Sequence, residues 1–209
     1  MPNSLKVFLN TSPAEALKLA PATIINGFDD DCPTERVRRY LAAAVRLSMM
    51  VNQRLTRLHV SPRKAAMWND PDGPEHYWFG EYTDRKVEKA CRTFEGITRH
   101  LSSRRLDITC SYRKELFGMA FPGLEKIWLY RYWRLPRRGS EIDDDAERVQ
   151  TFVHEASHIC GRTSFAELNA RNYGRDAAHR LTKWRMRATR NADNYGYYAL
   201  DVLERACAY

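Results

Sequence analysis

The stretch His154-Glu155-Ala156-Ser157-His158 decides most of what this sequence predicts. It follows the pattern H-E-x-x-H, in which a helix presents two imidazoles to one zinc ion and a carboxylate to the water that the zinc activates. Four helical residues turn the chain by about 400°, so His154 and His158 lie one turn apart on nearly the same helix face. Glu155 lies beside that face, where it can take a proton from the water and return it to a leaving amine. The stretch therefore predicts one Zn²⁺ per chain, with His154 and His158 as ligands and Glu155 as a catalytic residue.

The residues around this motif predict a helix that packs with its other side. An apolar stripe at helical spacing consists of Val149, Phe152, Val153, Ala156, Ile159 and Cys160. At about 100° per residue, the motif side chains point away from this stripe, toward a cleft or solvent. A capping box over residues 140–143 and the acidic residues 143–145 predict where the helix begins, and Gly161 predicts where it ends.

Length and composition indicate one folded domain with a short extension. The chain has 209 residues, of which 44% are hydrophobic, and this suffices for a core. We expect residues 1–31 to form an N-terminal arm and linker, and residues 32–209 to form a single catalytic domain. No apolar run reaches the length of a membrane span, and residues 1–10 lack the basic and then apolar pattern of a secretory signal. Two locations stay open, the cytoplasm and export without a cleaved signal.

The cysteines are odd in number and widely spaced. They are Cys32, Cys91, Cys110, Cys160 and Cys207. The absence of a C-x-x-C pair argues against a structural zinc ribbon. Free thiols in a reducing compartment are the simpler interpretation, with one or two disulfides left open.

The positive charge of the chain is spread along it rather than gathered. The net charge is +8, and arginines cluster around residues 36–39, 104–105, 131–138 and 185–190. Such dispersed clusters are typical of solvated basic faces, and nucleic-acid binding through them stays a less favoured alternative. The partner expected from the H-E-x-x-H motif is a protein or peptide substrate. The sequence does not indicate an oligomeric state.

The remaining periodicity predicts an α+β chain that is mostly helical, with a small sheet beside the metal helix. Helices are expected over residues 34–58, 84–104, 164–190 and 191–206, a small helix near 14–19, a loop over 60–83, and strands over 106–110 and 126–133. The second strand stands just before the metal helix, so a peptide substrate could pair with it near Tyr130. Ordinary sheet packing of its aromatic residues is an equal alternative.

A catalytic zinc ion usually takes three protein ligands and keeps one position for water. The two histidines leave one carboxylate or imidazole to be found downstream. The candidates are Glu167, Asp176, His179, Asp193, Asp201 and Glu204.

Residues 106–200 resemble the deuterolysin and peptidyl-Lys metalloendopeptidase family, the aspzincins. The resemblance lies in the order of the strand 127–132, the H-E-x-x-H motif, Tyr173-Gly174 and the segment Asn191-Ala192-Asp193-Asn194. It implies a zincin-like α+β fold and zinc-dependent hydrolysis of peptide bonds. In that family, a segment Gly-Thr-x-Asp-x-x-Tyr-Gly supplies the third zinc ligand through its Asp, and its Tyr helps to stabilise the transition state. By resemblance, Tyr173 is the oxyanion donor, a contribution of about 3 kcal/mol for one well-placed group.

The sequence departs from the family at the third ligand. Three residues before Tyr173 stands Ala170, which cannot bind a metal ion. Glu167, nine residues after His158, is the first choice in its place, although it also completes a capping box that begins at Ser164. Asp193 is the second choice.

Asp193 has another implied role, in substrate binding. In the lysine-specific members, the corresponding Asp and an acid three residues later line the pocket for the residue after the cut. Gly196 stands at the later position here, so one of the two acids is missing. The family's secreted members carry disulfides, and where a cysteine would pair with Cys110 this chain has Tyr130, which agrees with free thiols.

Two classes of function follow. The first is a zinc metalloendopeptidase, acting in its own cell or as an exported effector or toxin. The second, motivated by Ala170, is a catalytically degenerate zincin scaffold that serves as a protein-binding module.

Overall fold

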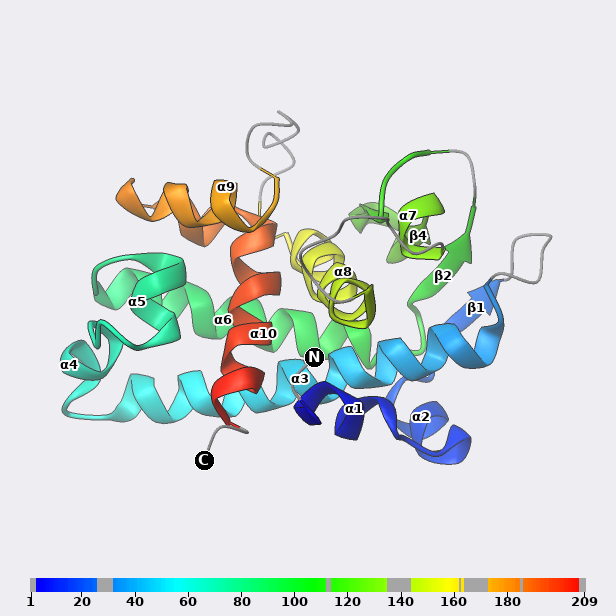
Figure 1. Ribbon diagram of the computed structural model, residues 1–209, viewed down its shortest axis with the longest axis horizontal. Helices are drawn as coiled ribbons and strands as arrows, with labels where there is room; N and C mark the ends of the chain where they lie inside the picture. The colour runs from blue at the N-terminus through cyan, green and yellow to red at the C-terminus, as the bar shows by residue number, and fades with distance from the viewer. Residues whose placement is uncertain are drawn as a thin grey trace.

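The computed structural model (Figure 1) describes residues 3–25, 32–111, 114–134, 144–161, 163, 173–184 and 186–206. The helices are α1 (Asn3–Leu9), α2 (Pro13–Leu19), α3 (Thr34–Val60), α4 (Lys64–Trp68), α5 (Pro74–Phe79), α6 (Asp84–Leu101), α7 (Arg131–Arg134), α8 (Asp144–Ile159), α9 (Arg175–Arg180) and α10 (Ala192–Ala206). The strands are β1 (Thr23–Ile25), β2 (Asp107–Cys110), β3 (Gly118–Phe121) and β4 (Lys126–Leu129).

Four long helices build the core of the molecule. Helix α3 runs along its length with α6 beside it, α8 packs on both, and α10 packs against α8 (Figure 1). The apolar spacing that predicted α3 and α6 is confirmed, because the buried side chains of each helix recur at that spacing. Helix α8 also forms as predicted, but it is buried on every side from Arg148 to Ile159. At Gly96 a Cβ atom would lie 2.8 Å from the Cβ of Cys160, so only glycine lets α6 approach the metal helix this closely.

A four-stranded sheet in the order β1-β2-β4-β3 lies beside α8. Strands β1, β2 and β4 are parallel, while β3 pairs antiparallel with β4 and forms an edge. The sequence predicted β2 and the first half of the 126–133 strand, but residues 131–134 turn into α7 instead. It did not predict β1 or β3.

The N-terminal residues belong to the same core rather than extending from it as an arm or linker. Helices α1 and α2 pack on α3, and β1 pairs with β2 through Ile24 and Ile108. Leu5, Leu9 and Ala16 are buried in the common hydrophobic cluster. Residues 26–31 lie outside the described part of the chain.

The cysteines differ from the free-thiol interpretation. Cys32, just before α3, forms a disulfide with Cys110 at the end of β2, which joins the N-terminal half to the sheet. Cys91 and Cys160 form no disulfide within the described residues, and Cys207 lies outside them. The interpretation is wrong for the first pair because residues 78 positions apart are brought together only by the fold.

Other differences concern local elements. The predicted loop over residues 60–83 contains α4 and α5, with Pro74 in the first turn of α5, where proline is tolerated. Of the helix predicted over 164–190, residues 175–180 are helical and short 3₁₀ turns follow at 181–183 and 188–190, while 164–172 are not described. The capping box at 140–143 also lies outside the described residues. Within the described ranges, no helix has the length and apolar character needed to cross a membrane.

Candidate metal centre

Helix α8 brings the predicted triplet together. One ligand atom from each of His154, Glu155 and His158 lies within 4.8 Å of the others, and no other such cluster occurs among the described residues. The sequence predicted that these side chains face a cleft or solvent. Instead they are only 8%, 5% and 5% exposed, because α8 is covered on this side by β3 and α10.

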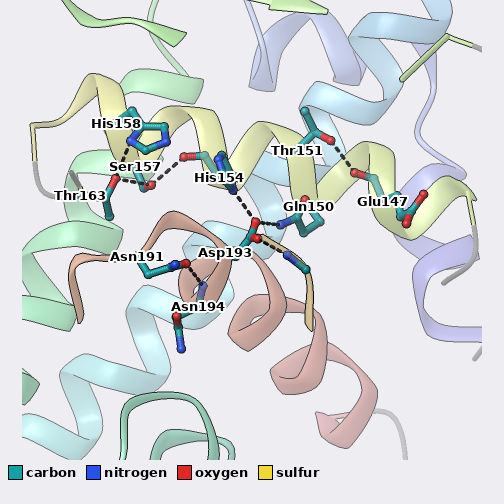
Figure 2. A network of polar contacts seen from close by, with 11 residues as sticks. Glu147, Gln150, Thr151, His154, Ser157, His158, Thr163, Asn191, Asp193 and Asn194 are labelled. Atoms are coloured by element: carbon teal, nitrogen blue, oxygen red, sulfur yellow. Dashed lines mark hydrogen bonds and ion pairs between the residues drawn. The ribbon is translucent and has the colours of Figure 1, made fainter. Parts of the chain in front are cut away.

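The His154 ring is oriented by Asp193, which projects from the first turn of α10 (Figure 2). The Nδ1 atom of His154 lies 2.6 Å from Oδ1 of Asp193. Burial alone would raise the pKa of Asp193, but the neighbouring His154 and hydrogen bonds from His154, Gly174 and Gln150 lower it. An ionised carboxylate only accepts, so Nδ1 of His154 donates, and Nε2 is the nitrogen left for a metal ion.

The tautomer of His158 follows from a chain of hydroxyl groups (Figure 2). Ser157 donates to the carbonyl oxygen of His154 (2.6 Å), so its Oγ is left to accept from Thr163 (2.9 Å). With its proton used in this way, the Thr163 hydroxyl accepts from Nδ1 of His158, 2.9 Å away. Burial, and then the charge of His154, lower the pKa of His158 to about 3, so the ring is neutral with its lone pair on Nε2, as a metal ligand requires.

Glu155 is held against the edge strand. The backbone N–H of Ala120 in β3 donates to its carboxylate, and a Cβ atom on Gly118 would lie 3.1 Å from its Oε1. Burial raises the pKa of Glu155, while the charge of His154 and the Ala120 N–H act in the opposite direction. Gly118 therefore permits a contact between strand and carboxylate that a larger residue would block.

Tyr173 lies over the metal helix. Its ring stacks on that of His154 at a centroid distance of 6.0 Å and an interplanar angle of 24°, and the residue is 46% exposed. The next residue, Gly174, has φ +94° and donates its N–H to Oδ2 of Asp193 at 2.7 Å. Asp193 thus contacts both the ring of His154 and the segment that carries Tyr173.

The segment Asn191-Ala192-Asp193-Asn194 begins α10. The side chain of Asn191 accepts from the backbone N–H of Asn194 at 3.2 Å, a typical N-cap contact. The Asn194 amide donates to the carbonyl oxygens of Trp78 (2.6 Å) and Ala178 (3.0 Å), so it joins α5 and α9 to α10. These contacts therefore fix the position of Asp193 beside His154.

The contacts of Asp193 argue against it as the alternative third ligand. Its Oδ1 contacts Nδ1 of His154 and the amide of Gln150 (3.2 Å), and its Oδ2 accepts from Gly174. It thus lies on the Nδ1 side of His154, away from the nitrogen that a metal ion would use. The same contacts, and an exposure of 5%, leave its carboxylate poorly placed to line a substrate pocket.

The other candidate ligands are also placed. Asp201 accepts from the Trp78 indole and from Arg175, both at 2.6 Å, and His179 contacts the Tyr77 carbonyl at 2.9 Å. Asp176 and Glu204 are exposed and do not join the cluster. Glu167 lies outside the described residues.

Tyr130 and its strand are not placed for the substrate contact that the sequence suggested. Strand β4 is paired on both sides, with β2 and with β3, so it has no open edge for a peptide. Tyr130 is 2% exposed, and its N–H donates to the carbonyl of Phe117 at 2.9 Å. The alternative interpretation, sheet packing, fits its position, and the edge strand is β3.

Sequence reasoning missed Thr163, Gln150 and Ala120. Gln150 precedes His154 by four residues, so it lies on the same helix face, which was an available signal. A neutral histidine ligand usually donates its other ring nitrogen to a nearby acceptor, and Thr163 is the first hydroxyl residue after Gly161. Nothing in the sequence indicated the backbone of Ala120.

Replacing Asp193 with asparagine will weaken zinc binding by about 10- to 100-fold, because the charge that orients and polarises His154 is lost. Competition titration against a chromophoric chelator measures this. Asp201→Asn is the matched control, a buried aspartate on the same helix that does not contact His154. Equal zinc affinities for the two variants would contradict the role of Asp193.

Comparisons with known proteins agree with this geometry. The chain matches the family described as lysine-specific metallo-endopeptidases, the aspzincins, over residues 74–200, which include the triplet, Tyr173 and Asp193. A solved structure, the zinc peptidase from Grifola frondosa, has a TM-score of 0.57 and 23% identity, over 80% of this chain and 96% of that one. The likeness confirms the predicted α+β zincin-like fold. No curated protein sequence matches the chain.

Proposed function

The chain belongs to the aspzincin family of metallopeptidases, and on that premise we propose that it is a zinc-dependent endopeptidase acting on protein substrates. The observation that carries the proposal is the pair of oriented imidazoles. Both Nδ1 atoms are engaged, by Asp193 and by Thr163, so each ring would use Nε2 to hold an ion beside Glu155.

The donor set of the site fits zinc. His154 and His158 would hold the ion, which supplies a Lewis acid that polarises the scissile carbonyl and lowers the pKa of water. We propose Glu167 as the third protein ligand. Its support is that the described carboxylates downstream of Glu155 are committed elsewhere or lie outside the cluster.

Glu155 is the general base and then the general acid of the proposed reaction. Its carboxylate takes a proton from the attacking water and passes it to the nitrogen of the leaving amine. The N–H of Ala120 holds the carboxylate in one orientation, and burial excludes the solvent that would otherwise compete for it.

Strand β3 is the proposed platform for an extended substrate. The carbonyl of Phe117, just before β3, accepts from the N–H of Tyr130, just after β4. In this antiparallel pair the alternate residues Gly118 and Ala120 therefore turn their backbone groups to the open edge. The contact of the Ala120 N–H with Glu155 agrees with this alternation. A peptide paired along this edge would pass beside Glu155.

Tyr173 is the proposed oxyanion donor, and its stacking on His154 supports this assignment. Tyr173→Phe removes the hydroxyl and keeps the ring, so we expect kcat to fall by about 100-fold with little change in zinc affinity. Steady-state kinetics on a quenched-fluorescent peptide, with zinc content measured in parallel, test this. A rise in KM with an unchanged kcat would contradict an oxyanion role.

We do not extend lysine preference to this chain. The Asp193 carboxylate is committed to three donors, and Gly196 offers no side chain. A Cβ atom at Gly196 would lie 2.5 Å from Nε2 of Gln150, so the Gln150 amide fills the space that a side chain would use.

We propose that the chain acts in an oxidising location after export. The Cys32–Cys110 disulfide supports this location, which is compatible with a role as an effector or toxin. Alkylation of the protein taken from its natural source, followed by mass spectrometry, tests it. Cys32 and Cys110 are expected to stay unalkylated because they are held in the disulfide. Alkylation of both contradicts the proposal.

The function is tested by incubating the zinc-loaded chain with an unfolded protein and sequencing the fragments. New N-termini are expected, and a chelator should suppress them until zinc is restored. The competing function, a degenerate scaffold that binds proteins, is favoured only by Ala170. It predicts no zinc after purification under metal-replete conditions and no fragments.

A further inference from the structure

A second cluster of side chains surrounds Arg175, two residues after Tyr173. The guanidinium of Arg175 lies over the rings of Trp78 and Tyr197, at 5.2 and 6.0 Å from their centroids. It also donates to Oδ1 of Asp201 at 2.6 Å, while the Trp78 indole donates to Oδ2 of the same carboxylate at 2.6 Å. We call Arg175, Trp78, Tyr197 and Asp201 the arginine clamp.

The clamp is built on rigid parts of the fold. Trp78 belongs to α5 and is fully buried, and Tyr197 and Asp201 belong to α10 and are 8% and 6% exposed. The rings of Trp78 and Tyr197 stack at 5.5 Å, which fixes the surface on which the guanidinium lies. A planar guanidinium suits both a ring face and a carboxylate, so arginine is well matched to this place.

One residue separates the clamp from Tyr173. Gly174, with φ +94°, makes a turn that L side chains rarely adopt, and its N–H is held by Asp193. Tyr173 therefore lies over His154 on one side of the turn while Arg175 is fixed to α5 and α10 on the other.

We propose that Arg175 is a positioning residue that holds Tyr173 over His154 through the turn at Gly174. The proposal rests on the proposed function where it concerns catalysis, but the placement of the segment can be tested without it. The half-exposed Tyr173 gains a fixed direction because the residue two positions later is anchored by an ion pair and two aromatic rings.

The placement is tested by amide hydrogen exchange of Gly174 in the metal-free chain. Arg175→Met should speed this exchange by about tenfold or more, while Arg175→Lys, which keeps the charge, should restore much of the protection. Arg187→Met is the matched control, since it removes another arginine–tryptophan contact, with Trp184 at 4.8 Å. The proposal is overturned if Gly174 exchanges at an unchanged rate in Arg175→Met, or if the amides throughout α10 lose protection to the same extent.

The catalytic consequence is tested by a double-mutant cycle with Tyr173→Phe. In the zinc-loaded chain, Arg175→Met should lower kcat by about tenfold with KM and zinc affinity nearly unchanged. In the Tyr173→Phe background, it should have less than about a twofold effect, because the hydroxyl that it positions is already absent. Fully additive losses overturn the proposal. If the parent chain cleaves nothing, the proposed function fails. The hydrogen-exchange result then still decides whether Arg175 holds the segment that carries Tyr173 in place.

Discussion

We expect the replacement of Glu155 with glutamine to lower kcat for peptide hydrolysis by about 1,000-fold, while the chain still binds one zinc ion. Glutamine has nearly the same shape as glutamate, and its amide oxygen can still accept the Ala120 N–H. It cannot take a proton from water, so the loss falls on the chemical step.

This result is measured by steady-state kinetics together with zinc content and thermal unfolding of both proteins. The matched control is Glu88→Gln, an exposed glutamate on α6 that forms an ion pair with Arg92. Activity that survives in Glu155→Gln with zinc bound would remove Glu155 from the reaction. Loss of zinc from this variant would instead assign Glu155 to metal binding.

We expect the replacement of His158 with glutamine to remove both zinc binding and hydrolysis. Nε2 of His158 is one of the two imidazole nitrogens proposed to bind the ion, so the zinc dissociation constant should rise by well over 100-fold, more than for a residue that only orients a ligand. Activity falls to background because the ion that polarises the carbonyl is no longer held.

His179→Gln is the control for this second prediction. His179 is a histidine of the same half of the chain that stacks on Tyr77 at 4.0 Å and lies outside the metal cluster. It should keep zinc and activity. If His158→Gln and His179→Gln bind zinc equally well, the metal centre is elsewhere.

The parts of the fold that were predictable from sequence are those with local periodicity. Helices α3 and α6 bury side chains at helical spacing over four or more turns, and the i, i+4 relation of His154 and His158 in α8 is itself local. Strand β3 was missed because Gly118-Met119-Ala120-Phe121 is short and does not alternate, and its place at the edge depends on pairing with β4. Helices α4 and α5 were hidden in a segment rich in proline, glycine and aromatic residues.

The parts of the site that were not predictable depend on long-range contacts. Asp193 was expected as a ligand or pocket residue, yet it lies 39 residues after His154 and meets the Nδ1 face of that ring only because α10 packs against α8. The Cys32–Cys110 bond likewise requires β2 and the start of α3 to be adjacent. The hydroxyl contact between Ser157 and Thr163 is local, because Ser157 lies within the motif and Thr163 follows it shortly, but the direction of its hydrogen bonds depends on the geometry.

Anomalous diffraction from zinc-soaked crystals, recorded on both sides of the zinc absorption edge, tests the central claim most directly. The account predicts one peak per chain, about 2.0–2.1 Å from Nε2 of both His154 and His158, with Asp193 still on Nδ1 of His154. A peak beside Nδ1 of either ring, or no peak between the two rings, would contradict it.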